Sequence, residues 1–353
     1  MKEKICYFIH TEYHLLLSLN DALEKYSDFD KFEVHFVIKR TSKSNRLKQN
    51  LDLSILPYNI KILDFTIDLS SKLIPVEKKQ LDDLLNFKFN IFVFFQEQDP
   101  ITIILINKYK EVNTKIYLYQ DGLKPYVMNG LKFTPSLLLT DIKQNRWIKR
   151  NGYAVKNHFS FITCKNYGFL KGIDKLFLTF PDAYKNWNNL PIETISLRFN
   201  EEFRNLLKKI FHWNDDLLHE KNKVIFFMNQ PMHDDGSFEV SVLKKLQKKY
   251  PESKIYIKNH PLTSKVKLER YKELEEITII DSKIPAELFI SELNNSIVFS
   301  ICSTSMFIND EKSKFYWINN IIEDNNVERL KKYAIVNPTR HIISVKSVDE
   351  IIF

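Results

Sequence analysis

The stretch KICYFIH, Lys4–His10, decides the fold class together with the segment from Tyr13 to Tyr26 that follows it. The first is an apolar run of strand length, and the second repeats apolar residues at the spacing of a helix face. A buried strand that leads directly into an amphipathic helix is the first half of a β/α unit. The opening of the chain therefore predicts an α/β protein.

The same alternation of short apolar runs and helix-length segments continues along the chain. Further strands are predicted at residues 32–38, 60–65, 90–95, 115–119 and 175–180, and then at 223–228, 254–258, 277–281 and 297–301. Helices are predicted around 201–211, at 238–250 and at 286–293. Strands that alternate with helices indicate parallel sheets, in which ligands bind beyond the carboxyl ends of the strands.

The length of 353 residues exceeds the size at which a single hydrophobic core usually stops growing. The strand and helix pattern loosens between residues 152 and 199. We therefore predict two domains, 1–200 and 201–353, that face a central cleft. The composition, 44% hydrophobic and 27% charged, is that of an ordinary folded chain.

Charge and cysteine content narrow the range of partners. A net charge of +8 favours anionic partners, and no RNP, KH or helix-turn-helix pattern supports nucleic-acid binding. Cys6, Cys164 and Cys302 are too scattered for a disulfide framework or a metal site, and we interpret them as buried thiols.

The location of the protein is predicted from its apolar runs. No run is long enough to span a membrane, and the N-terminus has no signal-peptide pattern, which predicts a cytoplasmic protein. The basic surface also suggests peripheral attachment to the inner face of the cytoplasmic membrane. The sequence makes no prediction of the oligomeric state.

Two short motifs directly follow predicted strands. In Tyr119-Gln120-Asp121-Gly122 a strand runs into a glycine turn, which presents Asp121 as a candidate general base. Asp-Gly is also an ordinary turn sequence. In Lys258-Asn259-His260-Pro261 the proline biases His260 toward an extended backbone. That imidazole is suited to donate a hydrogen bond to a leaving phosphate, or to serve a purely structural partner.

Two further motifs involve the starts of predicted helices. In Ser300–Ser305 (SICSTS) the hydroxyls of Ser303, Thr304 and Ser305 are suited to bind a phosphate together with the N-terminus of a following helix, or simply to cap that helix. In the segment IPAE, residues 284–287, Glu287 lies in a first helical turn. It is suited to accept hydrogen bonds from ribose hydroxyls, or to complement the helix dipole.

One loop contains residue types that bind divalent cations. The sequence His233-Asp234-Asp235-Gly236 offers two carboxylates, but Asp-Asp-Gly ahead of a helix is also a good turn and cap sequence. We therefore predict no metal and no cofactor. The absence of a GxGxxG or P-loop sequence argues in addition against a dinucleotide or nucleoside triphosphate site.

Taken in order, the Asp-Gly turn, the His-Pro pair and the Ser/Thr motif resemble the motif set of bacterial sialyltransferases and polysialyltransferases. The segment Tyr13-His14-Leu15-Leu16 is also similar to the start of many capsule and lipooligosaccharide enzymes of this kind. The resemblance implies an α/β GT-B fold with two Rossmann-like domains and catalysis without a metal. It assigns acceptor binding to 1–200 and binding of the nucleotide-sugar donor to 201–353.

The resemblance also implies roles for single residues. Asp121 would be the catalytic base and His260 the catalytic residue at the donor phosphate. The implied donor side consists of Lys258, Pro261, Glu287, Ser303, Thr304 and Ser305. The implied acceptor side consists of His10, Gln120 and Gly122, with Glu97 beside it, and Lys124 joins Lys258 as a cation for the charged donor.

One position departs from the family pattern. The family has two acidic residues before the glycine, whereas this chain has Gln120, so Asp121 must act alone. A Gln-Asp-Gly turn also resembles bacterial Kdo transferases, which makes CMP-Kdo or a related nonulosonate an alternative donor.

The implied function is inverting, metal-independent transfer of sialic acid from a CMP donor to a hydroxyl of a capsule or lipooligosaccharide glycan. Two further hypotheses stay open. One is a GT-B enzyme that transfers a polyol phosphate from a CDP donor. The other is a non-catalytic glycan- or nucleotide-binding protein, and the single acidic residue at Asp121 is the best argument for it.

Overall fold

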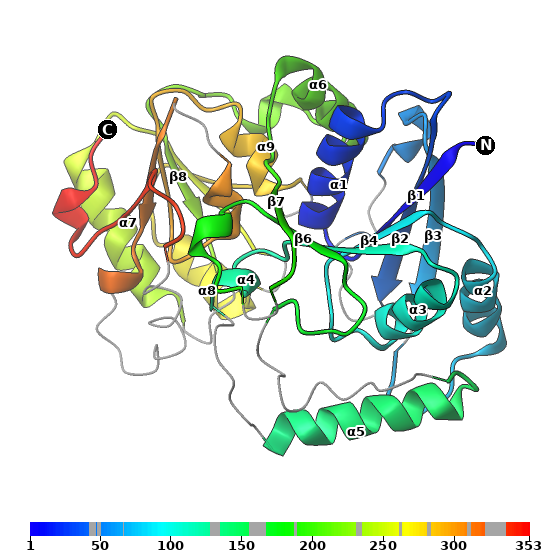
Figure 1. Ribbon diagram of the computed structural model, residues 1–353. Helices are drawn as coiled ribbons and strands as arrows, with labels where there is room; N and C mark the ends of the chain where they lie inside the picture. Colours follow the sequence, from blue (N-terminus) through cyan, green and yellow to red (C-terminus); the bar gives the residue numbers. More distant parts are fainter. Residues whose placement is uncertain are drawn as a thin grey trace. The chain divides into compact units, whose positions relative to one another are not determined.

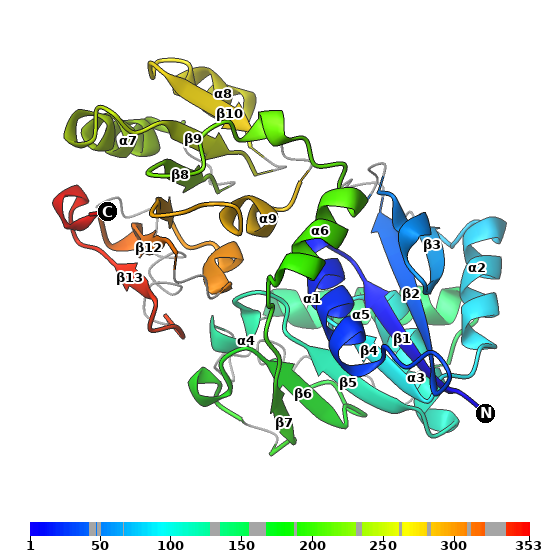
Figure 2. The same ribbon diagram turned by 90° about the horizontal axis from the view of Figure 1, so that it is seen from above.

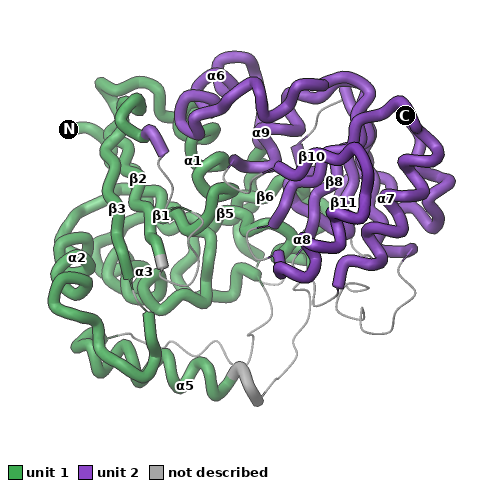
Figure 3. The backbone as a smooth tube through the Cα atoms, turned by 180° about the vertical axis from the view of Figure 1, so that it is seen from behind, with its two compact units in different colours: residues 1–49, 53–196 green, residues 50–52, 197–353 purple. Residues whose placement is uncertain are grey.

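The chain folds into two compact units. The computed structural model describes residues 1–41, 47, 51–65, 67–127, 135–154, 167–186, 189–230, 235–260, 263–280, 284–308, 312–321 and 337–353. Unit 1 comprises residues 1–49 and 53–196, and unit 2 comprises residues 50–52 and 197–353 (Figure 3).

Unit 1 contains a parallel sheet of seven strands in the order β3-β2-β1-β4-β5-β6-β7. The strands are β1 (Glu3–Ile9), β2 (Phe32–Thr41), β3 (Asn59–Phe65), β4 (Ile91–Phe94), β5 (Lys115–Tyr119), β6 (Lys175–Leu178) and β7 (Ile192–Thr194). The central strands β1 and β4 are apolar and buried on both faces, as parallel strands covered by helices must be.

Helices cover both faces of this sheet. They are α1 (Glu12–Lys25), α2 (Pro75–Leu85), α3 (Pro100–Glu111), α4 (Lys124–Val127) and α5 (Pro135–Arg150), with short 3-10 turns η2 (Leu53–Ile55) and η3 (Pro181–Ala183). In Figure 2, α1 lies on one side of the sheet, and α2 and α3 lie on the other. This is the arrangement that right-handed crossovers produce when the strand order reverses direction.

A buried carboxylate ties α1 to the sheet. Asp21, only 1% exposed, accepts hydrogen bonds from the hydroxyls of Tyr7 on β1 at 2.5 Å and Tyr119 on β5 at 2.7 Å. The ammonium of Lys25 lies 2.7 Å from its other oxygen. Because successive strand residues face opposite sides, Phe8 points the other way, and its ring is tilted against that of Phe92 with the centroids 6.0 Å apart.

Unit 2 contains a second parallel sheet, of six strands in the order β10-β9-β8-β11-β12-β13. The strands are β8 (Ile225–Met228), β9 (Ile255–Lys258), β10 (Ile277–Ile280), β11 (Ile297–Ser300), β12 (Lys314–Trp317) and β13 (Ile342–Ser344). The helices are α6 (Glu201–Ile210), α7 (Ser237–Lys249), α8 (Lys265–Tyr271) and α9 (Ala286–Ile290), with 3-10 turns η4 (Asp215–Leu217), η5 (Thr304–Phe307), η6 (Asn319–Ile321) and η8 (Val348–Glu350) (Figure 1).

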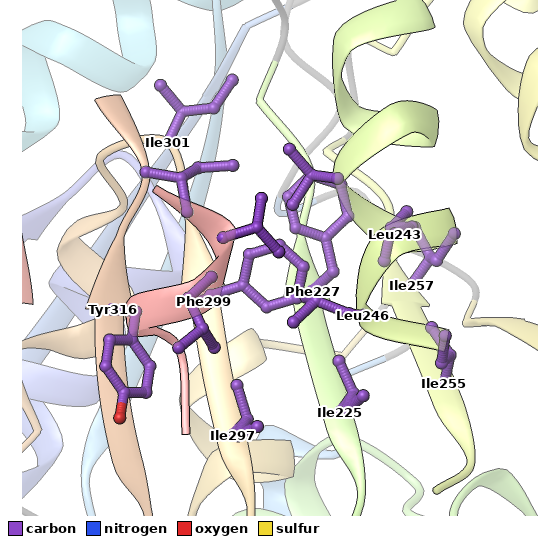
Figure 4. Packing of buried hydrophobic residues seen from close by; sticks show 14 of the residues in the cluster. Ile225, Phe227, Leu243, Leu246, Ile255, Ile257, Ile297, Phe299, Ile301 and Tyr316 are labelled. Carbon is purple, nitrogen blue, oxygen red and sulfur yellow. The ribbon is translucent and has the colours of Figure 1, made fainter. Parts of the chain in front are cut away.

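The core of unit 2 lies between one face of this sheet and α7. Figure 4 shows Ile225, Phe227 and Phe299 from the strands beside Leu243 and Leu246 of α7. The opposite face is covered by α9, whose Phe289 stacks on Phe226 with ring centroids 6.0 Å apart. Successive side chains of β8 therefore pack alternately against the α7 side and the α9 side of the sheet.

A buried ion pair joins the two outer helices of unit 2. Lys267 on α8 and Glu239 on α7 form a salt bridge with both side chains at most 1% exposed. Gly236, at the N-cap of α7, has φ +83°, and a Cβ there would lie 2.8 Å from Cγ of Lys267. The left-handed backbone and the close approach both require glycine at this position.

The strands and helices agree with the sequence predictions where the apolar runs are long. β5 has the predicted limits, and β1, β2, β4, β8, β9 and β11 fall within about three residues of theirs. Cys6 and Cys302 are buried free thiols, as interpreted, and Cys164 lies outside the described residues. Within the described ranges, no helix is both long and apolar enough to cross a membrane.

Candidate functional site

Both sheets have a point at which the strand order reverses, between β1 and β4 in unit 1 and between β8 and β11 in unit 2. Ligands of open α/β sheets bind beyond the strand ends at such points. In unit 1 the chain places His10, Glu97 and Asp99 after β1 and β4, and Asp121 after the neighbouring β5. Each unit therefore carries its own cluster of polar residues, described in turn below.

The Asp121 turn is held by backbone contacts. Gly122 has φ +60°, a conformation that favours glycine, and the N–H of Lys124 donates to the carbonyl of Asp121 at 3.2 Å. The N–H of Asp121 donates to the hydroxyl of Tyr167 at 3.1 Å, and that hydroxyl donates to the carbonyl of Tyr119. The glycine turn predicted from the sequence is present.

The carboxylate of Asp121 has two different neighbours. Its Oδ1 lies 3.1 Å from Nε2 of His14, which is fully buried, and its Oδ2 pairs with the ammonium of Lys124, which is 49% exposed. Burial alone would raise the pKa of Asp121, but the hydrogen bond from His14 and the nearby ammonium of Lys124 hold it well below its ordinary value. Asp121 is therefore ionised across the physiological range.

Gln120 supports this turn from inside the fold. Its side chain is fully buried, and its amide nitrogen donates to the hydroxyl of Tyr13 at 3.1 Å. Its amide oxygen accepts from the hydroxyl of Tyr126 and from the N–H of Thr179 at 2.8 Å. An acceptor contact through this amide, as predicted, would require these hydrogen bonds to change.

A buried charged cluster lies beside His10. Asp99 caps α3 by accepting from the N–H and the hydroxyl of Thr102, both at 2.9 Å, and it pairs with Lys39 of β2. Nε2 of His10 lies 3.7 Å from Oδ2 of Asp99. Burial lowers the pKa of His10 to about 4 despite this carboxylate, so the imidazole is neutral at pH 7.

Glu97 anchors the segment after residue 166. It accepts from the N–H groups of Gly168 at 2.8 Å and Leu170 at 2.9 Å. Burial raises the pKa of Glu97 to about 7, even though these hydrogen bonds favour its ionised form. A carboxyl group with this pKa is only partly ionised at neutral pH.

In unit 2 the motif that contains His260 follows β9. Lys258 is 5% exposed, and its Nζ lies 5.8 Å from the ring centroid of Phe289. The carbonyl of His260 accepts from the N–H of Thr263 at 2.9 Å and from its hydroxyl at 2.7 Å. Asn229, after β8, donates to that hydroxyl at 3.0 Å. The backbone at His260 is thus fixed, whereas Pro261 lies outside the described residues.

The serine-rich motif follows β11. The N–H of Ser303 donates to Oγ of Ser300 at 2.7 Å, and Oγ of Ser303 accepts from the N–H of Ser305 at 3.3 Å. The helix expected to begin here is a 3-10 turn of four residues, Thr304–Phe307. A helix-dipole contribution to phosphate binding therefore does not apply, because a single turn has no sizeable macrodipole, and any anion contact would come from the hydroxyls and N–H groups.

Glu287 lies in the first turn of α9, behind Pro285 at the N-cap, and is 5% exposed. Two of the four residues of the candidate metal loop, His233 and Asp234, lie outside the described residues, which include Asp235 and Gly236. Asp235 accepts from the N–H of Ser237 at 3.0 Å and pairs with Arg270 at 3.2 Å. In the part of the chain that the structure describes, no group of three or more His, Cys, Asp or Glu side chains could hold a metal ion.

The structure adds three residues to the unit 1 cluster that the sequence analysis did not assign to it: His14, Lys39 and Asp99. His14 and Asp121 are 107 positions apart in sequence, so no short motif links them. The available signal was a histidine on the buried face of the helix that follows the first strand. The predicted residues His10, Glu97, Asp121 and Gly122 do follow strands at one edge of this sheet.

Comparison with solved structures identifies the fold. The chain resembles the GT-B domain of a sialyltransferase from Photobacterium damselae, with 12% identity, a TM-score of 0.57 and coverage of 97% of this chain and 99% of that one. A 2,6-sialyltransferase from a Photobacterium species, solved with CMP and lactose, has 12% identity and a TM-score of 0.52, with coverage of 98% of this chain and 78% of that one. A putative UDP-N-acetylglucosamine 2-epimerase from Listeria monocytogenes has 12% identity and a TM-score of 0.51, with coverage of 86% of this chain and 75% of that one. The fold is therefore GT-B, as predicted.

A family model identifies the family of the chain. The model of the family alpha-2,8-polysialyltransferase (POLYST) matches residues 27–312. The chain belongs to this family and is a glycosyltransferase, which confirms the resemblance found in the sequence. A search of curated proteins returned no match.

Proposed function

We propose that the chain transfers sialic acid, or a related nonulosonate, from a CMP donor to a hydroxyl of a cell-surface glycan. The observation that carries this proposal is the carboxylate of Asp121, which the glycine turn presents after β5 and which is ionised and held by His14. Sugar transfer to a hydroxyl needs a fixed carboxylate to take the acceptor proton.

The proposed step is a single in-line displacement. The acceptor O–H bond breaks and its proton passes to Asp121 while the acceptor oxygen forms a bond to the anomeric carbon. The bond from that carbon to the phosphate oxygen breaks, and CMP leaves with the electron pair. Because the acceptor attacks opposite the leaving group, the anomeric configuration inverts.

The donor side of the proposal rests on unit 2. His260 is suited to donate a hydrogen bond to the departing phosphate, and the buried Lys258 is suited to balance its charge. Ser303, Thr304 and Ser305 supply hydroxyls after β11, and Glu287 supplies a carboxylate for the ribose. No metal takes part in the proposed step.

The proposed acceptor is a capsule or lipooligosaccharide glycan that already ends in sialic acid. The family's description, an alpha-2,8-polysialyltransferase, supports this choice, and the net charge of +8 suits a polyanionic acceptor. We further propose that the protein acts in the cytoplasm, attached peripherally to the inner face of the membrane. Absence of sedimentation with anionic vesicles at moderate salt would contradict this attachment.

The deciding experiment follows CMP release in EDTA. Purified protein is incubated with CMP-sialic acid, with and without sialylated and galactoside acceptors, for wild type, Asp121→Ala and His260→Ala. We expect acceptor-stimulated release by the wild type and near-complete loss in both variants. Hydrolysis of CMP-sialic acid also distinguishes an enzyme from a non-catalytic binding protein.

Parallel reactions test the donor. Turnover of CMP-Kdo or CDP-glycerol in place of CMP-sialic acid would contradict the donor assignment and favour the corresponding alternative. Release that requires added Mg²⁺ or Mn²⁺ would contradict the metal-independent mechanism.

A further inference from the structure

His14 lies in the first turn of α1, directly beyond the carboxyl end of β1. Its backbone N–H donates to Oγ1 of the N-cap residue Thr11 at 3.3 Å, which fixes the start of the helix. The family model begins at residue 27, so His14 lies ahead of the residues that it matches.

The His14 ring is immobilised by aromatic contacts. It is fully buried and stacks on Phe95 with ring centroids 4.1 Å apart and an interplanar angle of 6°. The ring of His10 stands nearly perpendicular to it at 6.0 Å, and that of Tyr13 lies 6.4 Å away. A ring packed in this way keeps one orientation and points the same nitrogen at the same neighbour.

The hydrogen bonds of the ring define its tautomer. The backbone N–H of His10 donates to Nδ1 of His14 at 3.3 Å, so Nδ1 is an acceptor without a proton. The proton of the neutral ring is then on Nε2, and it is donated to Oδ1 of Asp121 at 3.1 Å. A ring arranged in this way cannot take a second proton from Asp121 at Nε2.

The two oxygens of Asp121 are therefore not equivalent. Oδ1 is hydrogen-bonded to a buried ring that is packed on Phe95, whereas Oδ2 pairs with Lys124, a side chain that is 49% exposed. The backbone N–H of Asp121 is held separately by Tyr167.

We propose that His14 is a positioning residue for the transfer reaction: its Nε2–H fixes Oδ1 of Asp121, so that Oδ2 is the oxygen that receives the acceptor proton. This inference rests on the proposed function of Asp121 as the base. The roles are the reverse of those in a Ser-His-Asp triad, where the carboxylate orients the imidazole. Here the imidazole orients the carboxylate and takes no proton.

Two substitutions separate the hydrogen bond from the packing. His14→Phe keeps a ring to stack on Phe95 but removes the donor, whereas His14→Gln loses the ring but places an amide N–H near the position of Nε2. His35→Phe is the matched control, because His35 is a half-buried histidine on β2 of the same unit that pairs with Glu33 at 2.7 Å, away from Asp121.

Steady-state kinetics of CMP release across pH provide the readout. A hydrogen bond to a charged group is worth enough to change a rate roughly 10- to 100-fold. We expect His14→Phe to lower kcat by about this factor with KM little changed. His14→Gln should retain most of the rate, and His35→Phe should match the wild type.

The pKa of Asp121 distinguishes positioning from a structural defect. The charged and titratable groups around Asp121 are His14, Lys124 and Tyr167, with Glu97 nearby. Loss of the Nε2 donor disfavours the carboxylate, so the pKa of Asp121, followed by ¹³C NMR in an acid titration, should rise in His14→Phe. Glu97 is unchanged in all variants and does not account for a shift confined to His14→Phe.

Two results would overturn the inference: a pKa of Asp121 that does not rise in His14→Phe, or His14→Gln as impaired as His14→Phe while both keep the melting temperature of the wild type. The failure of the proposed function looks different, because the wild type would then release no CMP from any donor, or Asp121→Ala would stay active. In that case ¹³C NMR titration of the Asp121 carboxyl decides. A pKa that is the same in His14→Phe and wild type would refute the holding role.

Discussion

Replacing Asp21 by alanine removes the carboxylate that links α1 to two strands of the unit 1 sheet. The change leaves the hydroxyls of Tyr7 and Tyr119 in the core without the acceptor they share. It also removes the partner of Lys25, whose side chain is 35% exposed. The perturbation is therefore two unsatisfied buried donors and one lost ion pair near the surface.

The magnitude follows from these contacts. A buried donor that loses its partner costs about 1 to 3 kcal/mol, and an exposed ion pair contributes at most about 1 kcal/mol. Asp21→Ala should therefore lower the free energy of unfolding of unit 1 by roughly 2 to 7 kcal/mol. This is a large part of the ~5 to 15 kcal/mol that stabilises a typical domain.

Hydrogen exchange read by mass spectrometry assigns the loss to one unit. Peptides from β1 and β5 should exchange faster in Asp21→Ala, while peptides from β8 and β11 of unit 2 should keep their rates. Glu111→Ala is the control, because Glu111 is an acidic residue, 52% exposed, with only an i,i+3 pair to Lys108, and it should cost under about 0.5 kcal/mol.

A double-mutant comparison tests the cause. In a chain that already carries Tyr7→Phe and Tyr119→Phe, no hydroxyl depends on Asp21, so the further change Asp21→Ala should cost much less. If Asp21→Ala costs no more than Glu111→Ala, or costs the same with and without the two hydroxyls, the reasoning is refuted.

Two other predictions concern buried charges. Since burial lowers the pKa of His10 to about 4, the unfolded chain binds a proton first as pH falls from about 6.5, and stability is lost from there down to the folded pKa. Between pH 7 and pH 4 the wild type should lose about 3 kcal/mol of unfolding free energy from this titration, measured by urea unfolding, and His10→Phe should not. If the unfolding free energies of wild type and His10→Phe fall in parallel with pH, the explanation is contradicted. In unit 2, Glu239→Ala leaves the ammonium of Lys267 buried without its ion-pair partner and should cost about 3 to 5 kcal/mol in urea unfolding. The double variant Glu239→Leu with Lys267→Met should recover most of the stability that Glu239→Ala loses. If the double variant is destabilised as much as Glu239→Ala, the explanation is refuted.

The sequence predicts the elements whose signal is continuous. β1, β5 and β11 each contain a continuous apolar run and lie inside a sheet, so their burial is visible in composition alone. β7 and β13 were not predicted because they are three-residue strands at the sheet edges, half-exposed in part. A run of that length has no measurable periodicity, and such strands form because a neighbouring strand offers hydrogen bonds.

The candidate site follows the same distinction. Asp121 was predictable because a strand followed by Asp-Gly specifies its own turn. His14 was not, because its role depends on a contact with a residue 107 positions away. Within its own helix, the spacing of His14 only shows that it lies on the buried face. The serine-rich motif predicted a helix, but its hydroxyl oxygens accept from backbone N–H groups of the same motif, which forms a single 3-10 turn.

The two buried cysteines give each unit its own internal probe of opening. Cys6 lies within β1 of unit 1 and Cys302 lies after β11 of unit 2. Burial raises the pKa of both thiols, that of Cys302 to about 12, and alkylating reagents attack the thiolate. With Cys164 replaced by serine, each remaining thiol is modified only as fast as its own unit opens. One labelling time course, resolved by peptide mass, therefore reports the opening rates of the two halves of the enzyme separately and without any added probe.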